Sequence, residues 1–178
     1  MRMPRSRIGR AAVGAALAAV LLSGCTPTPE PTPTPTGFAT DEEAFEAAEA
    51  TYRSYLSAFD AMDLADPDSF EPVFAWTTGA ALAKDRKTLT TMHANGWLMT
   101  GAGQIVSMHE GARSSERVTA VACIDVSDVQ IVDAEGASQV EPDRAERFGL
   151  ALSFTYSSDS PTGLLIEKSE SAEDQPCE

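Results

Sequence analysis

Several kinds of residue are scarce in this sequence, and each shortage argues against a class of protein. Only 13 Lys and Arg stand against 27 Asp and Glu, which gives a net charge of −14. A surface of this sign repels phosphate, so we do not expect a nucleic-acid partner. The apolar run at residues 11–22 is too short to cross a bilayer comfortably, because a spanning helix needs about 20 residues.

The short motifs of several enzyme classes are also missing. HExxH, G-x-S-x-G, the P-loop and the Rossmann glycine pattern are all absent. The two histidines and three cysteines do not have the spacing of metal ligands. We therefore expect neither a metal nor another cofactor.

The first 25 residues have the layout of an export signal. Four arginines precede the apolar run, and Leu-Ser-Gly-Cys follows it at residues 22–25. This ending resembles the lipobox of bacterial lipoproteins. The resemblance implies that residues 1–24 are removed and that Cys25 carries a diacylglycerol with fatty chains of the palmitate type. At about 0.8 kcal/mol for each buried CH₂, two acyl chains would hold the protein on the extracytoplasmic face of the cell membrane. The alternative is a plain signal peptide or signal anchor that happens to contain a cysteine.

A proline-rich linker follows the cysteine. Proline alternates with Thr or Glu over residues 26–36, and proline fixes φ and lacks an N–H, so neither a helix nor a sheet is available. Polyproline II geometry, at about 3.1 Å per residue, would make this segment roughly 34 Å long. We predict that residues 25–37 form a stalk, and its threonines are potential O-glycosylation sites. A spacer with no further role is the alternative.

Residues 38–178 have the composition of one globular domain with its own core. Without the four signal arginines, nine basic residues remain against 27 acidic ones, so the mature chain has a net charge near −18. Such a charge repels an anionic lipid surface and permits a cationic ligand.

Two cysteines remain if Cys25 carries lipid. An exported, oxidising environment favours a disulfide between Cys123 and Cys177, and two free thiols are the alternative. The bridge would close a loop of about 54 residues, which contributes roughly 4 kcal/mol in the chain-entropy account. It would tie the acidic C-terminal tail to a strand.

Helical periodicity dominates the first half of this domain. Thr40 and Glu43 have the spacing of a capping box. A second long helix is predicted over about 79–94, with the Asn-Gly at 95–96 as its end. The first helix has an apolar face at helical intervals, made of Phe45, Ala48, Tyr52, Leu56 and Phe59.

Beyond Gly96 the apolar residues recur with a period of two residues, as in strands, instead of the 3.6 residues of a helix. Alternation is clear over residues 117–126 and 147–156, and further strands are predicted near 104–110 and after residue 163. Helices followed by antiparallel strands indicate an α+β domain in which the helices cover one face of the sheet.

This order of elements resembles the NTF2-like, or SnoaL-like, fold over residues 38–178. The helix DEEAFEAAEATYRSYLSAFDAM and the strands RVTAVACIDVSDVQIVDAEG and RFGLALSFTYS carry the resemblance. The chain is also similar to actinobacterial envelope lipoproteins with such a domain, in which a strand cysteine pairs with one near the C-terminus. The resemblance implies a curved sheet that wraps helices around a conical pocket, and a homodimer through the sheet, which such domains often form.

Some NTF2-like relatives are isomerases or epoxide hydrolases that use a pocket carboxylate as a base. Asp125 is a candidate for that role, and a surface position beside the cysteine bridge is the alternative. His93 is a second candidate, although its place near a helix C-terminus also suits a packed or capping histidine. Tyr55, Trp76 and Trp97 are candidates for the pocket wall.

Three functions stay open from the sequence. The first is a lipid-anchored envelope module that binds a small apolar ligand or another envelope protein without catalysis. The second is an isomerase or hydrolase that uses a pocket carboxylate, and the third is a structural component that dimerises. The contents of the pocket discriminate among them. A buried carboxylate with a hydrogen-bond donor favours an enzyme, an open apolar cleft with a few polar groups favours binding, and a filled cone favours a structural role.

Overall fold

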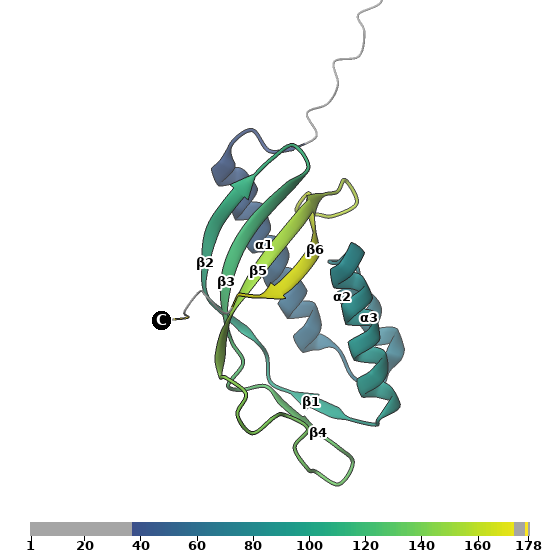
Figure 1. Cartoon of the computed structure of the whole chain (residues 1–178). Coiled ribbons are helices and arrows are strands. Elements are labelled where there is room, and N and C mark those ends of the chain that lie inside the picture. The colour runs from purple at the N-terminus through teal and green to yellow at the C-terminus, as the bar shows by residue number, and fades with distance from the viewer. Residues whose placement is uncertain (1–36, 173–176, 178) are drawn as a thin grey trace, which may run out of the picture. The chain divides into compact units, whose positions relative to one another are not determined.

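The computed structural model describes residues 37–172 and 177 (Figure 1). The predicted lipidation site Cys25, the signal segment and the linker up to residue 36 lie outside the described residues. None of the helices in the described part of the chain combines the length and the apolar character needed to cross a membrane.

Helix α1 (Asp41–Ala61) begins at the predicted capping box. The Thr40 hydroxyl accepts a hydrogen bond from the Glu43 backbone N–H at 3.1 Å, and the Glu43 carboxylate accepts one from the Thr40 N–H. The first turn is acidic, which suits the positive end of the helix dipole. The predicted apolar face is confirmed, because Ala48 and Tyr52 are buried. Phe45, Leu56 and Phe59 pack partly buried against the core.

Two short helices and one longer helix follow. The 3-10 helix η1 (Pro67–Phe70) leads directly into α2 (Glu71–Phe74). Helix α3 (Gly79–Ala94) has Asn95 as its C-cap, as the Asn-Gly pair predicted. These elements share a small apolar cluster with the end of α1, and its buried members are Leu64, Phe70, Val73 and Leu89.

Four antiparallel strands form the main sheet in the order β2-β3-β5-β6. A separate two-stranded ribbon is formed by β1 (Leu98–Thr100) and β4 (Gln130–Val132). The domain is therefore α+β, with the helices before the sheet, as the change of period predicted. The bounds of the main strands are Gln104–Arg113 for β2, Arg117–Asp125 for β3, Arg147–Tyr156 for β5 and Leu164–Ser171 for β6.

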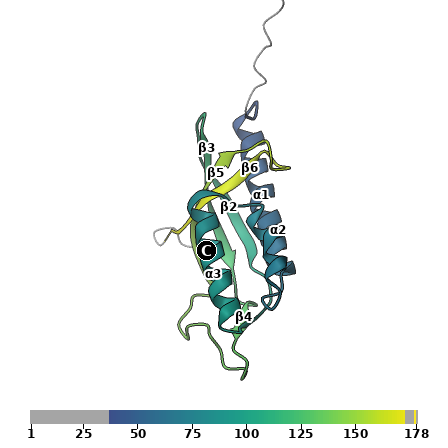
Figure 2. The ribbon, with the colours of Figure 1, turned by 90° about the vertical axis from the view of Figure 1, so that its right-hand side faces the viewer.

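One face of the main sheet meets the helices. Strand register pairs Val118 with Phe154 and Ala120 with Leu152, and all four side chains are buried. Figure 1 shows α1 crossing behind the strands and α3 beside β6, and in the turned view of Figure 2 α3 lies in front of the sheet. The alternation predicted from the sequence thus separates a core face from an outer face.

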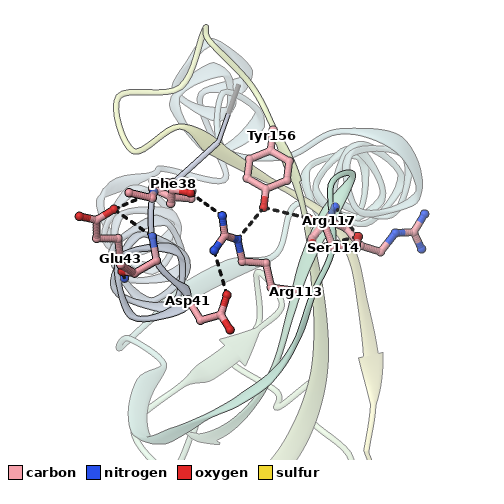
Figure 3. A network of polar contacts seen from close by, with 9 residues as sticks. Phe38, Asp41, Glu43, Arg113, Ser114, Arg117 and Tyr156 are labelled. Carbon is pink, nitrogen blue, oxygen red and sulfur yellow. Dashed lines mark hydrogen bonds and ion pairs between the residues drawn. The ribbon is translucent and has the colours of Figure 1, made fainter. Parts of the chain in front are cut away.

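A polar cluster fixes the start of the domain to the sheet (Figure 3). Arg113, at the end of β2, donates to the backbone oxygen of Phe38 and to the Asp41 carboxylate, the latter at 2.8 Å. Its Nε donates to the Tyr156 hydroxyl at 3.4 Å, and that hydroxyl donates to the Ser114 carbonyl oxygen at 3.1 Å. We call these five residues the entry cluster, because they lie where the described chain enters the domain.

The predicted cysteine pair lies on the outer face of the sheet. Cys123 alternates along β3 with the inward residues Ala122 and Ile124. It lies at disulfide distance from Cys177, with 5.4 Å between the two Cα atoms. Residue 177 therefore meets β3 near the C-terminal end of that strand, as expected for a tail tied to a strand.

Candidate functional site

A cavity of about 290 Å³ lies between the helices and the inner face of the sheet. Its lining comes from α1, α3, β1, β3, β5 and β6, together with Thr77 before α3, the loop at residues 101–103 and the turn after β3. Pockets that bind small molecules occupy about 300–1,000 Å³, so the volume of this cavity is just below that range. It has room for a small organic molecule.

Helix α1 contributes aromatic side chains to the cavity. Tyr52, Tyr55 and Phe59 follow one another at intervals of three and four residues, so they share one face of the helix. The Tyr55 ring lies 5.8 Å from the Tyr52 ring and 5.8 Å from the Phe59 ring, between centroids. The prediction that Tyr55 lines the pocket agrees with this arrangement.

The sheet side of the cavity is uncharged. The charged residues of the lining all come from the helices: Asp60 from α1, and Lys84 and Asp85 from α3. The wall is therefore mostly apolar, with its charge concentrated on one side. The strands, ribbon and turn contribute Met99, Ile124, Val126, Val129, Phe148, Leu150, Ile166 and Ser169.

Asp85 is the polar centre of the cavity. The Tyr55 hydroxyl donates a hydrogen bond to its Oδ1 at 3.2 Å. Its other oxygen, Oδ2, is buried and has no hydrogen-bond partner among the described residues. In that part of the chain no other buried side-chain nitrogen or oxygen is left unpaired. An unpaired buried polar atom costs about 1–3 kcal/mol, and a bound donor or a catalytic role is among the explanations for such an atom.

Burial raises the pKa of Asp85 to about 6, while the Tyr55 hydrogen bond and the nearby Lys84 charge act in the opposite direction. Burial also raises the pKa of Tyr52 and Tyr55, and the negative charge of Asp85 adds to that effect. Near neutral pH the cavity therefore holds a largely ionised carboxylate beside two protonated tyrosines. Such a carboxylate can accept hydrogen bonds from a ligand or take up a proton.

Two glycines shape the edge of the cavity. Gly101 has φ of +80°, and a Cβ at this position would lie 2.0 Å from the Asp128 carbonyl oxygen. Only glycine allows this close approach between the loop and the turn after β3. Gly103 lines the cavity beside Leu56 and Ile124, where a side chain would take up space.

The predicted base Asp125 lies on the outer face of the sheet and does not line the cavity. The Arg147 Nε donates to its Oδ2 at 2.7 Å, and the Ser127 hydroxyl donates to its Oδ1 at 2.6 Å. The Ser127 hydrogen bonds, followed by the contact with Arg147, lower the pKa of Asp125 to about 2. A carboxylate held in its ionised form by such contacts is a poor base, so the arrangement favours the alternative surface role beside Cys123.

Three more predicted site residues, His93, Trp76 and Trp97, also lie outside the lining of the cavity. His93 Nδ1 is 2.7 Å from the Leu64 carbonyl oxygen, and its ring meets Phe70 edge-on, as expected for a packed histidine. Trp76 belongs to the connection between α2 and α3, whose backbone pairs with β6, and Trp97 directly precedes β1. Both tryptophans lie in segments without a clear period, so their direction could not be predicted.

The sequence prediction missed Asp85. This residue lies four positions after Ala81 and four before Leu89, and both of those residues are buried. Positions separated by four residues share a helix face, so Asp85 is on the inner side of α3. A charged residue between two apolar positions at this spacing was the signal that could have identified it.

A second hollow, of about 240 Å³, lies between α1 and β2. Its polar lining is acidic apart from one histidine: Glu42, Glu46, Glu49, His109 and Glu110. Within residues 37–172 and 177, no group of three or more His, Cys, Asp and Glu side chains could hold a metal ion. We assign no site to this hollow.

No protein-family profile and no curated protein matches the sequence. Among solved structures, a candidate aromatic ring hydroxylase from Novosphingobium aromaticivorans aligns with a TM-score of 0.53 and 12% identity, over 78% of this chain and 94% of that one. The intermembrane space region of the chloroplast protein ARC6 aligns with a TM-score of 0.47 and 14% identity, over 71% and 94% of the two chains. A periplasmic fragment of TraM aligns with a TM-score of 0.43 and 14% identity, over 75% of this chain and 98% of that one.

The likeness to the first of these structures concerns the fold alone, because a fold at this identity does not determine an activity. The chain has an NTF2-like α+β fold, with helices packed on an antiparallel sheet. Any function has to be argued from the cavity and its residues.

Proposed function

We propose that the chain is a lipid-anchored module of the bacterial cell envelope, and that its domain binds a small, largely apolar molecule in the cavity. The unpaired Oδ2 of Asp85 carries the proposal. A bound molecule with a hydrogen-bond donor would satisfy this oxygen, while its apolar part would cover the aromatic and aliphatic lining.

The anchor is supported by the sequence at residues 22–25, which follows a basic segment and a short apolar run. We expect Cys25→Ala to shift the protein from the membrane fraction to the medium, or to leave it as an uncleaved precursor. Cell fractionation with immunoblotting measures this shift. Normal processing together with unchanged membrane retention would contradict the proposed lipid anchor.

The two remaining cysteines are proposed to form a disulfide in the exported protein. Their Cα distance of 5.4 Å is within the usual range for such a bond. Mass spectrometry under non-reducing conditions should find the Cys123 peptide joined to the Cys177 peptide. Free thiols at both positions would contradict this proposal.

Binding in the cavity can be tested with a neutral probe, 2-phenylethanol, by titration calorimetry. The full chain is held in phosphatidylcholine nanodiscs, and the heat measured with empty nanodiscs is subtracted. We expect saturable binding to the wild-type chain. Thr88→Trp should abolish it, because Thr88 lines the cavity, whereas Thr90→Trp should retain it, because Thr90 is an exposed residue of the same helix. No saturable binding to the wild-type chain would refute the proposed binding function.

Catalysis by Asp85 is the second candidate function. A carboxylate whose pKa is about 6, next to a tyrosine hydroxyl at 3.2 Å, has the parts of a general base and a hydrogen-bond donor. Styrene oxide tests hydrolysis directly: a water molecule activated by Asp85 would open the epoxide to a diol. Diol formation that is lost in Asp85→Asn would favour the hydrolase, and no turnover with intact binding of 2-phenylethanol would favour the binding module.

A further inference from the structure

We infer that the cavity selects organic amines, with the ammonium group of the ligand paired to Asp85 and its apolar body against the aromatic side chains of α1. This inference rests on the proposed function, because it names the class of ligand for the same cavity.

One oxygen of the Asp85 carboxylate can still accept a hydrogen bond from a ligand. Oδ1 already accepts from the Tyr55 hydroxyl, and Oδ2 has no partner among the described residues. Lys84 lines the same cavity, but the ion pairs of residues 37–172 and 177 do not include one between Lys84 and Asp85. An ammonium N–H would supply the missing donor in a charge-assisted hydrogen bond, which is about twice as strong as a neutral one.

The charge of the lining favours a cation over an anion. Asp60 and Asp85 are negative and Lys84 is positive, and the strands, ribbon and turn add no charged side chain. The cavity therefore has a net negative charge, and an anionic ligand would bring a second negative group next to a half-buried carboxylate. The negative charge of the mature chain also raises the local concentration of cations.

The aromatic side chains near Asp85 suit the same ligand. The Tyr55 hydroxyl donates a hydrogen bond to the Asp85 carboxylate. The Phe59 ring, one turn further along α1, lies 5.8 Å from the Tyr55 ring between centroids. An ammonium group within about 6 Å of an aromatic ring face is attracted by the ring quadrupole. An amine with one ring and a short chain would thus place its charge at Asp85 and its ring among the apolar side chains of the lining.

The test compares two probes of nearly equal shape, 2-phenylethylamine and 2-phenylethanol. Both are titrated by calorimetry at neutral pH into the full chain in phosphatidylcholine nanodiscs. We expect the amine to bind the wild-type chain at least about tenfold more tightly than the alcohol. Asp85→Asn should remove this preference while the alcohol still binds, because the amide keeps the shape of the side chain and removes its charge.

A matched control removes one negative charge from the other side of the sheet. Asp125→Asn changes the net charge by the same amount, and Asp125 lies outside the cavity. We expect this variant to keep the preference for the amine. Equal affinities of the two probes for the wild-type chain, or a preference that survives Asp85→Asn, would overturn the inference and leave the proposed binding function standing. Binding of neither probe would overturn both.

Discussion

The entry cluster and the surroundings of Asp85 are built from the same kinds of groups, but their hydrogen bonds differ. In both places a tyrosine hydroxyl meets a charged side chain from another element. In the entry cluster every guanidinium nitrogen of Arg113 has a partner, and the Tyr156 hydroxyl both accepts and donates. At Asp85 one carboxylate oxygen has none among the described residues.

This difference separates a structural role from a functional one. Polar groups that satisfy one another hold elements together, and a ligand would have nothing to add to them. A buried polar atom without a partner costs stability, and a ligand that brings a donor offsets this cost. We therefore assign the entry cluster to folding and the cavity around Asp85 to function.

The largest effect on stability is expected from Arg113→Met. This change removes the hydrogen bonds that join Phe38, Asp41 and Tyr156 to the end of β2. We expect the melting temperature to fall by about 5–10 °C, measured by circular dichroism. Arg53→Met is the control, because Arg53 forms only an exposed ion pair within α1 and should change the melting temperature by no more than about 2 °C. Equal changes of the melting temperature in the two variants would contradict the structural role assigned to the entry cluster.

The removal of one tyrosine hydroxyl from each place compares the entry cluster with the surroundings of Asp85 directly. Tyr156→Phe should cost about 1 kcal/mol of unfolding free energy at any pH between 5 and 8, because none of its lost partners titrates in this range. Tyr55→Phe should have little effect at pH 5 and cost up to about 1 kcal/mol at pH 8, since it removes a donor from the ionised form of Asp85. Denaturant unfolding at the two pH values measures both. A pH-independent cost for Tyr55→Phe would show that its hydroxyl does not support the Asp85 carboxylate.

An effect of similar size is expected from the pH dependence of stability that comes from Asp85 itself. Its pKa is raised in the folded state, so the stability it contributes is present below the unfolded value of about 3.9 and lost as the pH rises through about 6. Between about pH 4 and pH 7 the wild-type chain should therefore lose on the order of 1 kcal/mol relative to Asp85→Asn. The full shift implies more, but water reaches part of this side chain and screens its charge. A constant difference between the two proteins over this range would contradict the raised pKa.

The regular elements of the fold could be predicted because their signals are local. Thr40 and Glu43 lie within one turn of each other, and the alternation from Val118 to Ile124 is continuous along one strand. Each of these patterns depends on neighbours in the sequence, so no knowledge of the packing was needed.

The cavity could be predicted only in part, because it depends on how α1 and α3 pack. Tyr55 was identified as a wall residue, but its partner Asp85 lies 30 residues away on another helix. The strand pattern placed Asp125 on one face and could not show which face meets the pocket. That question was decided by the helices, which cover the face of Ile124 and leave Asp125 outside.

The most direct test of the ligand site is the pKa of the Asp85 carboxyl, measured by carbon-13 NMR on the full chain in nanodiscs. The titratable and charged groups that line the cavity with this carboxyl are Tyr52, Tyr55 and Asp60 on α1 and Lys84 on α3. We expect a pKa near 6 for the free protein, a lower value with 2-phenylethylamine, because a bound cation stabilises the ionised form, and little change with 2-phenylethanol. A pKa near the ordinary value of about 3.9 that neither probe moves would contradict the assignment of this cavity as the ligand site.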